Sequence, residues 1–175
     1  MSILKIITIP DKKLRETSSE VTVFDKKLLD FIDDMIDTLR SKPGLGLAAP
    51  QVGANIRIIL IESRGVKDED GNVIYENIPL KVLINPEITK FSRDKIEMEE
   101  GCFSVPNVFG PVTRPKKIKV TAQDRHGKKI SINASGLLSR VIQHEVDHLN
   151  GVLFIDLVED KTKLREIRTE EEIQG

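Results

Sequence analysis

The chain has 175 residues, of which 39% are hydrophobic and 31% are charged, and its formal net charge is -1. This length favours one domain over 1–175 with a substantial core, and the near-neutral charge gives no sign of a nucleic-acid-binding surface. No apolar run approaches the roughly 20 residues that span a bilayer, and the N-terminus lacks a signal-peptide pattern. Because Cys102 is the one cysteine, no internal disulfide can form, which suits a reducing, cytoplasmic location.

The first predicted helix begins at Asp25. Residues 1–24 are expected to form an irregular lead-in. Beyond Asp25, a potential N-cap, apolar residues recur every three and four positions, at Leu28, Leu29, Ile32, Met35, Ile36 and Leu39. This period is typical of an amphipathic helix, which Lys42-Pro43-Gly44 would end. We interpret this helix as structural.

Small residues dominate the next segment, from Gly44 to Gly53. It lacks the third glycine and the Lys-Ser/Thr pair of phosphate-binding loops, so nucleotide binding is not favoured. The small side chains are expected to let the backbone approach a ligand or a packed helix closely. Gln51 is either the one polar side chain that projects from this strip or an ordinary surface glutamine.

Strands are predicted over 56–61, 81–84, 116–123 and 129–133, where β-branched residues gather or alternate with polar ones. Asn85-Pro86 is expected to stop the second strand, and the Pro/Gly-rich stretch 107–115 is expected to be a loop. Turns are predicted at Asp70-Gly71 and at 124–127, where His126 should be exposed and not a ligand. Short turns between strands favour antiparallel sheets.

The segment His144-Glu145-Val146-Asp147-His148 holds two of the three histidines of the chain. In a helix they lie one turn apart on one face and can bind one metal ion, with Glu145 beside them to move protons of a bound water. Apolar residues around the circumference predict that this helix is buried. Ser135 could cap its start, and Gly151 could end it in the left-handed conformation.

The third metal ligand decides the chemistry, because catalytic zinc sites usually have three protein ligands and an open position. Phe154 occupies the place of the third histidine in the long metalloprotease pattern, so that pattern fails. Glu159 or Glu166 would make a zinc endopeptidase, although both lie in a charged tail. Cys102 would supply a soft thiolate suited to Zn²⁺ or Fe²⁺, or it is an inert buried cysteine. A closed structural site would need a fourth ligand, and none is obvious.

The C-terminal part is expected to begin with a short strand over 152–155. From Glu159 to residue 175 the chain is rich in both charges, which predicts a charged tail or a short solvated helix.

Three blocks of the sequence resemble the peptide deformylase family. They are Gly44-x-Gly46-x-Ala48-Ala49-x-Gln51, Glu100-Gly101-Cys102-x-Ser104 and Gln143-His144-Glu145-x-Asp147-His148. They follow the order of the family, and the resemblance extends from the lead-in to Phe154. Phe103 departs from the usual leucine, and Arg140 departs from the apolar residue that some members carry near the substrate pocket.

The resemblance implies a hydrolase that removes the N-formyl group from the formyl-methionine of new polypeptides and releases formate. It implies that Cys102, His144 and His148 bind one divalent metal ion per chain, Fe²⁺ as the native ion, with Zn²⁺ or Ni²⁺ as alternatives. A hydroxide on this metal would attack the formyl carbon, and Glu145 would be the general acid/base. The Gln51 side chain and the backbone N–H of Phe103 would stabilise the oxyanion.

Leu45, Gly46, Leu137 and Val141 are expected to line an apolar pocket for the methionine side chain. Glu100 and Asp147 are either residues that orient the ligands or ordinary ion pairs. N-formyl-methionyl nascent peptides are the expected partners, with proximity to the ribosome as a further expectation, although the acidic tail differs from the basic helix with which some members dock.

The predicted fold is therefore α+β. Antiparallel sheets would wrap a buried central helix that carries the His-Glu-x-x-His motif. An N-terminal amphipathic helix would pack outside, and a short helix would stand at the C-terminus.

Overall fold

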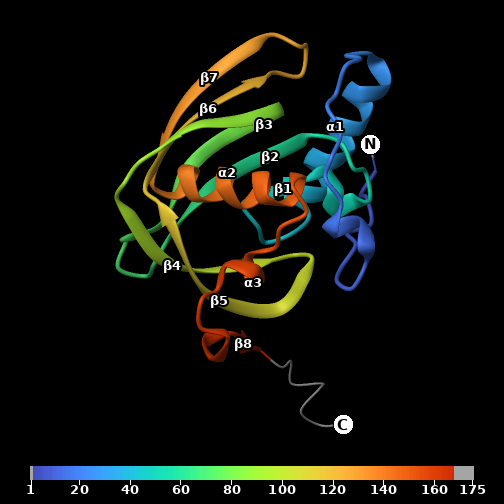
Figure 1. Cartoon of the computed structure of the whole chain (residues 1–175). Helices are drawn as coiled ribbons and strands as arrows, with labels where there is room; N and C mark the ends of the chain where they lie inside the picture. The colour runs from blue at the N-terminus through green and yellow to red at the C-terminus, as the bar shows by residue number, and fades with distance from the viewer. Residues whose placement is uncertain (1, 168–175) are drawn as a thin grey trace.

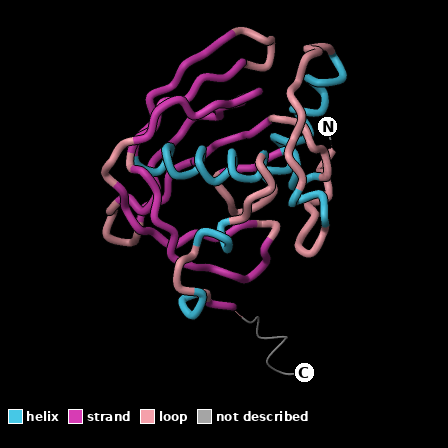
Figure 2. Tube along the Cα trace, in the orientation of Figure 1, coloured by secondary structure: helices cyan, strands magenta, loops and turns pink. Residues whose placement is uncertain are grey.

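The computed structural model describes residues 2–167 and has an α+β fold, in which antiparallel strands outnumber helices (Figures 1 and 2). This confirms the expected fold class. The α-helices are α1 (Lys26–Arg40), α2 (Gly136–Leu149) and α3 (Phe154–Leu157), and the 3-10 helices are η1 (Lys12–Arg15), η2 (Ala49–Val52) and η3 (Lys161–Lys163). The strands are β1 (Gly46–Ala48), β2 (Ile58–Lys67), β3 (Val73–Phe91), β4 (Lys95–Cys102), β5 (Val105–Pro115), β6 (Lys117–Gln123), β7 (Lys129–Ser135) and β8 (Arg165–Glu166).

The larger sheet has five antiparallel strands in the order β1-β2-β3-β6-β7. Its strand β2 explains the unbroken apolar run of the sequence, because both of its faces are covered. Ile58 and Leu60 belong to the core that faces α1, whereas Ile59 and Ile61 belong to the core that faces α2. A strand buried on both faces needs apolar residues at every position.

The helix α1 begins where its sequence predicts. The side chain of Asp25 accepts a hydrogen bond from the N–H of Leu28 at 2.9 Å, which satisfies one of the donors left open at a helix start. The apolar face, including Ile32 and Met35, is fully buried against β1 and β2.

The helix α2 packs on the opposite face of the five-stranded sheet. In Figure 1 it crosses the middle of the molecule, with β6 and β7 above it and β4 and β5 below it. The second sheet, in the order β4-β5-β8, is also antiparallel, and α3 packs beside it in a small core around Phe154. Thus α2 lies between the two sheets.

The two ends of α2 differ in how well the sequence predicted them. Gly151 has φ +72°, and a Cβ there would lie 2.4 Å from the backbone oxygen of Arg15, so glycine is required. The expected cap from Ser135 was wrong, because its side chain makes no capping hydrogen bond. Instead Ser135 ends β7, and the N–H of Gly136 donates to the oxygen of Lys116 at 3.2 Å.

The strand β3 continues through Asn85-Pro86, where the sequence predicted a stop. Asn85 takes a left-handed φ of +50°, and the pairing with β6 shifts register between Ile84 and Glu87. The Asn85 side chain also bonds the N–H and the carbonyl of Val21, both at 2.8 Å. A β-bulge therefore absorbs the proline, and the strand resumes beyond it.

The stretch 107–115 is not a loop, as was predicted, but most of β5. Pro111 lies opposite Glu99 of β4, and on its other side β5 is joined by β8 only at Val108 and Phe109. Proline has no N–H to donate, and it is tolerated in a strand where one edge is unpaired. The proline and glycine content of this stretch alone therefore predicted a loop where the chain forms a strand.

The C-terminal predictions were wrong in part in the residues that the structure describes. The segment expected as a strand over 152–155 leads into the short helix α3. Up to residue 167, the tail from Glu159 is charged and mostly exposed, which agrees with the first of the two predicted alternatives, and it forms η3 and β8 rather than a solvated helix. The rest of the predicted tail, 168–175, lies outside the described residues. No helix of the described chain is long and apolar enough to cross a membrane.

Candidate active site

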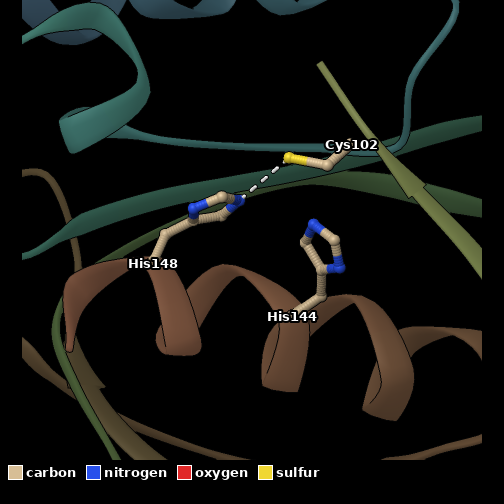
Figure 3. Close-up of side chains that lie close together, drawn as sticks. All are labelled: Cys102, His144 and His148. Atoms are coloured by element: carbon tan, nitrogen blue, oxygen red, sulfur yellow. Dashed lines mark hydrogen bonds between the residues drawn. The ribbon is translucent and has the colours of Figure 1, made fainter. Parts of the chain in front are cut away.

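The two histidines of α2 and Cys102 converge at one point. Their ligand atoms all lie within 4.8 Å of one another, and the Cys102 Sγ is 3.3 Å from the His148 Nε2. Figure 3 shows both rings projecting from α2 toward the sulfur atom. The spacing i, i+4 places the rings on one helix face, with centroids 5.2 Å apart. A thiolate with two imidazoles is a donor set that suits a transition-metal ion.

Cys102 reaches this point because β4 ends there with a register shift. The pairing of β4 with β5 shifts between Gly101 and Cys102. A Cβ on Gly101 would lie 2.6 Å from the ring of Phe109, so glycine lets the two strands approach closely. The N–H of Ser104 donates to the Cys102 Sγ at 3.4 Å, which helps to fix the position of the sulfur.

Glu145 lies beside the cluster and is buried, with 4% of its surface exposed. Its Oε2 has no hydrogen-bond partner within residues 2–167, and burial raises the pKa of its carboxyl group to about 7. Gly46 makes room for it, because a Cβ there would lie 2.4 Å from the Glu145 Oε1. The expected close approach of a small residue to a packed helix is therefore observed at β1.

Gln51 is a buried residue of η2, not a surface glutamine, and only 1% of it is exposed. Its Oε1 accepts a hydrogen bond from the N–H of Ala48 at 2.9 Å, which fixes the orientation of the amide. The Nε2 therefore faces the site, 3.3 Å from the Ser104 Oγ and 3.5 Å from the Cys102 Sγ. An N–H donor thus lies beside the sulfur.

Glu100 supports His144 through a buried network of charges. Its Oε1 is 2.7 Å from the His144 Nδ1. Arg114 donates to both carboxylate oxygens at 2.6 and 2.9 Å and to Asp147 at 2.8 Å. Burial alone would raise the pKa of Glu100, but the hydrogen bonds from His144 and Arg114 lower it to about 2. The carboxylate therefore stays charged and holds the imidazole.

Sequence reasoning missed Arg114, because it lies in the stretch 107–115 that was expected to be a loop. It also left the role of Arg140 open. Arg140 is buried, and it donates to Glu100 at 2.6 Å and to the carbonyl oxygens of Ile96 and Val112 at 2.7 and 3.0 Å.

A pocket of about 530 Å³ opens beside the cluster. It is lined by all four residues that the sequence assigned to a substrate pocket and by Phe103, together with the site residues Gln51, Cys102, His144 and Glu145. Tyr75, Met98 and Arg140 also line it and had not been predicted to do so. The apolar wall of the pocket therefore lies next to the buried polar side chains of Cys102, His144 and Glu145.

The other proposed ligands lie elsewhere. Glu159 and Glu166 are exposed in the tail and do not belong to the cluster. His126, which was not predicted to be a ligand, is exposed in the turn after β6, as expected. In the part of the chain that the structure describes, no fourth ligand joins the two histidines and Cys102.

Residues 3–164 match the family model described as polypeptide deformylase. A peptide deformylase of Picosynechococcus sp. is 45% identical over 92% of this chain and 82% of its own length. The chloroplastic peptide deformylase 1B of Oryza sativa subsp. japonica is 40% identical over 87% of this chain and 54% of its own, so this chain spans about half of that relative. The crystal structure of a peptide deformylase from Synechococcus elongatus in complex with actinonin is similar with a TM-score of 0.82 and 39% identity, over 91% of this chain and 81% of that one.

Proposed function

The chain belongs to the polypeptide deformylase family, whose members remove the N-formyl group from new polypeptides, and we propose that its Cys/His/His cluster and Glu145 perform this hydrolysis. One observation carries the proposal. The sulfur of Cys102 and imidazole nitrogens of His144 and His148 lie within 4.8 Å of one another, beside the buried carboxyl group of Glu145, one oxygen of which has no hydrogen-bond partner among the described residues.

The residues of this site fit a divalent metal ion. His144 is oriented by Glu100 through its Nδ1, as a carboxylate commonly orients a metal-binding histidine. Cys102, His144 and His148 would hold the ion, and three protein ligands leave a position open. When bound, the ion would supply Lewis acidity, which lowers the pKa of water and polarises a carbonyl group. We propose Fe²⁺ as the native ion, with Zn²⁺ or Ni²⁺ as alternatives. Thiolate and imidazole are suitable ligands for all three ions.

Glu145 is proposed as the general acid/base. A pKa near 7 lets one carboxyl group both accept and donate a proton at neutral pH. Its carboxylate would take a proton from the attacking water and pass it to the nitrogen of the departing amine. The unpaired Oε2 is the atom available for this transfer.

Gln51 and the backbone of Phe103 are proposed to stabilise the charge that develops on the formyl oxygen. The Gln51 amide is fixed by Ala48, so its N–H group needs no reorientation during the reaction. Glutamine suits this place because it donates a hydrogen bond without carrying a charge that competes for the cation.

The nascent peptide is proposed to enter along two strand edges. Among the described strands, β1 pairs only with β2 and β4 only with β5, and residues of both line the pocket. An extended peptide can add to such an edge through its backbone groups. Leu45, Leu137 and Val141 would then contact the methionine side chain, and Gly46 would leave room for the peptide and for Glu145.

The cellular setting extends this proposal. We propose that formyl-methionyl nascent peptides meet the enzyme close to the ribosome in the cytoplasm, where a single free thiol such as Cys102 stays reduced.

The test compares formyl-Met-Ala-Ser with unformylated Met-Ala-Ser and with an internal-peptide substrate, using metal-loaded protein. Formate release from the formylated peptide alone is expected, and Glu145→Ala should abolish it while the metal content stays at the wild-type level. Cleavage of internal bonds without regard to the formyl group would favour an endopeptidase instead.

A further inference from the structure

Arg140 lines the pocket, while its guanidinium donates hydrogen bonds to groups of β4 and β5. It lies on α2 one turn before His144, it is 6% exposed, and it lines the pocket next to Leu137 and Val141. Because Arg140 lies on the same helix face as His144, its side chain contacts both the pocket and the strands β4 and β5.

The guanidinium of Arg140 joins α2 to both strands of the hairpin β4–β5. Its Nη1 donates to the Glu100 carboxylate and to the carbonyl of Val112, and its Nη2 donates to the carbonyl of Ile96 at 2.7 Å. Within residues 2–167, the last of these is the only hydrogen bond from α2 to residues 95–99 of β4. Arg140 is therefore the polar connection that holds this part of β4 against the helix.

This part of β4 is otherwise held by its pairing with β5 and by the ion pair of Glu99 with Arg165 at 2.6 Å, and neither of these connects it to α2. Ile96 and Met98 are 45% and 42% exposed and belong to none of the buried core clusters of the described chain. On one side β4 pairs with β5, and its other edge has no strand partner in the described chain. Met98 and Glu99 nevertheless line the pocket, so the position of this edge decides how wide the pocket is.

Arg114 performs a different task at the same carboxylate. Its side chain binds Glu100 through two hydrogen bonds and reaches Asp147, but within the described chain this side chain makes no hydrogen bond to residues 95–99, which Arg114 meets only through the pairing of its backbone with Ile96. Arg114 can therefore keep Glu100 in place for His144 without Arg140. Arg114 therefore supports the Glu100–His144 pair, whereas Arg140 supports the strand β4 in the wall of the pocket.

We propose that Arg140 is a specificity-determining positioning residue, which holds the free edge of β4 against α2 and thereby sets the width of the pocket for the first side chain of the substrate. This inference rests on the proposed function, since the pocket is taken as the place of the formyl-methionine side chain.

The test compares Arg140→Met, Arg140→Lys, Arg114→Met and the control Arg125→Met in metal-loaded protein. Arg125 pairs with Asp33 far from the pocket. For each variant, kcat and KM are measured with formyl-Met-Ala-Ser and formyl-Leu-Ala-Ser, together with the metal content and the hydrogen exchange of amides 95–99.

In Arg140→Met, the preference for methionine over leucine is expected to fall about tenfold, within the range by which pocket shape discriminates apolar side chains. KM should rise more than kcat falls, the metal content should stay unchanged, and amides 95–99 should exchange faster. Arg140→Lys should recover part of the preference, because one donor remains. Arg114→Met should instead lose metal and kcat, and Arg125→Met should match the wild type.

An unchanged methionine preference or unchanged exchange in Arg140→Met overturns the inference, and so does a joint loss of metal and kcat like that of Arg114→Met. If Arg140→Met does not fold, the same comparison in Arg140→Lys decides, with a smaller expected change. A wild-type protein that releases no formate would refute the proposed function instead, whereas the exchange of amides 95–99 would still report whether Arg140 holds β4.

Discussion

Replacing Glu145 with glutamine should stabilise the metal-free protein at high pH while removing its activity. The Glu145 carboxyl group is buried, and its Oε2 has no partner within residues 2–167. Burial raises its pKa from an ordinary 4.5 to about 7. The folded protein therefore favours the neutral form, which glutamine reproduces at every pH.

The size of the effect follows from this shift. A folded pKa above the unfolded one adds stability below pH 4.5, and this contribution is lost as the pH rises through about 7. At roughly 1.4 kcal/mol for each pH unit of the shift, ionised Glu145 destabilises the metal-free fold by about 3 kcal/mol at pH 8 and by less than about 1 kcal/mol at pH 5.

The assay is thermal unfolding of chelator-treated wild type and Glu145→Gln at pH 5 and pH 8. The advantage of the variant in melting temperature is expected to grow by about 5–10 °C between the two pH values, because about 1 kcal/mol corresponds to 2–4 °C in a chain of this size. Glu97→Gln serves as a control, because the Glu97 carboxyl group is exposed to solvent. An advantage of Glu145→Gln that does not change with pH would refute the assignment of an unpaired, buried carboxyl group.

Three further predictions concern the site. Cys102→Ala should lose most of its bound metal, measured by elemental analysis after purification, because two imidazoles alone bind a metal more weakly; a wild-type metal content would show that the sulfur is not a ligand. Gln51→Ala should lower kcat by about 10²–10³ and change KM less, since the amide acts on charge in the transition state; a change confined to KM would make Gln51 a binding residue. Gly46→Ala should fold, as circular dichroism would report, but lose about 10²-fold in kcat, because the new Cβ displaces Glu145 from its position; wild-type turnover would show that this contact does not matter.

The sequence predicted the elements whose signals are local. The amphipathic period and the Asp25 cap located α1, and Gly151 located the end of α2. Each of these depends on neighbours a few residues apart, so it can be found without knowing the fold. The spacing of His144 and His148 belongs to the same class, because one turn of helix is enough to bring them together.

The role of Cys102 could not be decided in that way. It lies 46 positions from His148 along the chain, and only the packing of α2 between two sheets brings the sulfur to the imidazoles. The residues alone left an inert cysteine and a ligand as equal alternatives, and the resemblance to a family supported the second. The convergence of the three ligand atoms is the physical ground that the sequence lacked.

The wrong assignment of residues 107–115 had a functional consequence. Proline and glycine between 107 and 115 predicted a loop, and an arginine in a loop gives no reason to expect a buried partner. Once β5 pairs with β4, Arg114 lies opposite Ile96, with its side chain buried against Glu100. A buried arginine must be paired, and here its partner is the carboxylate that orients His144. The role of Arg114 beside the proposed metal ligand His144 was therefore missed because the secondary structure of its segment was predicted wrongly. Local sequence patterns could have revealed this role only if the strand that pairs with β5 had been known.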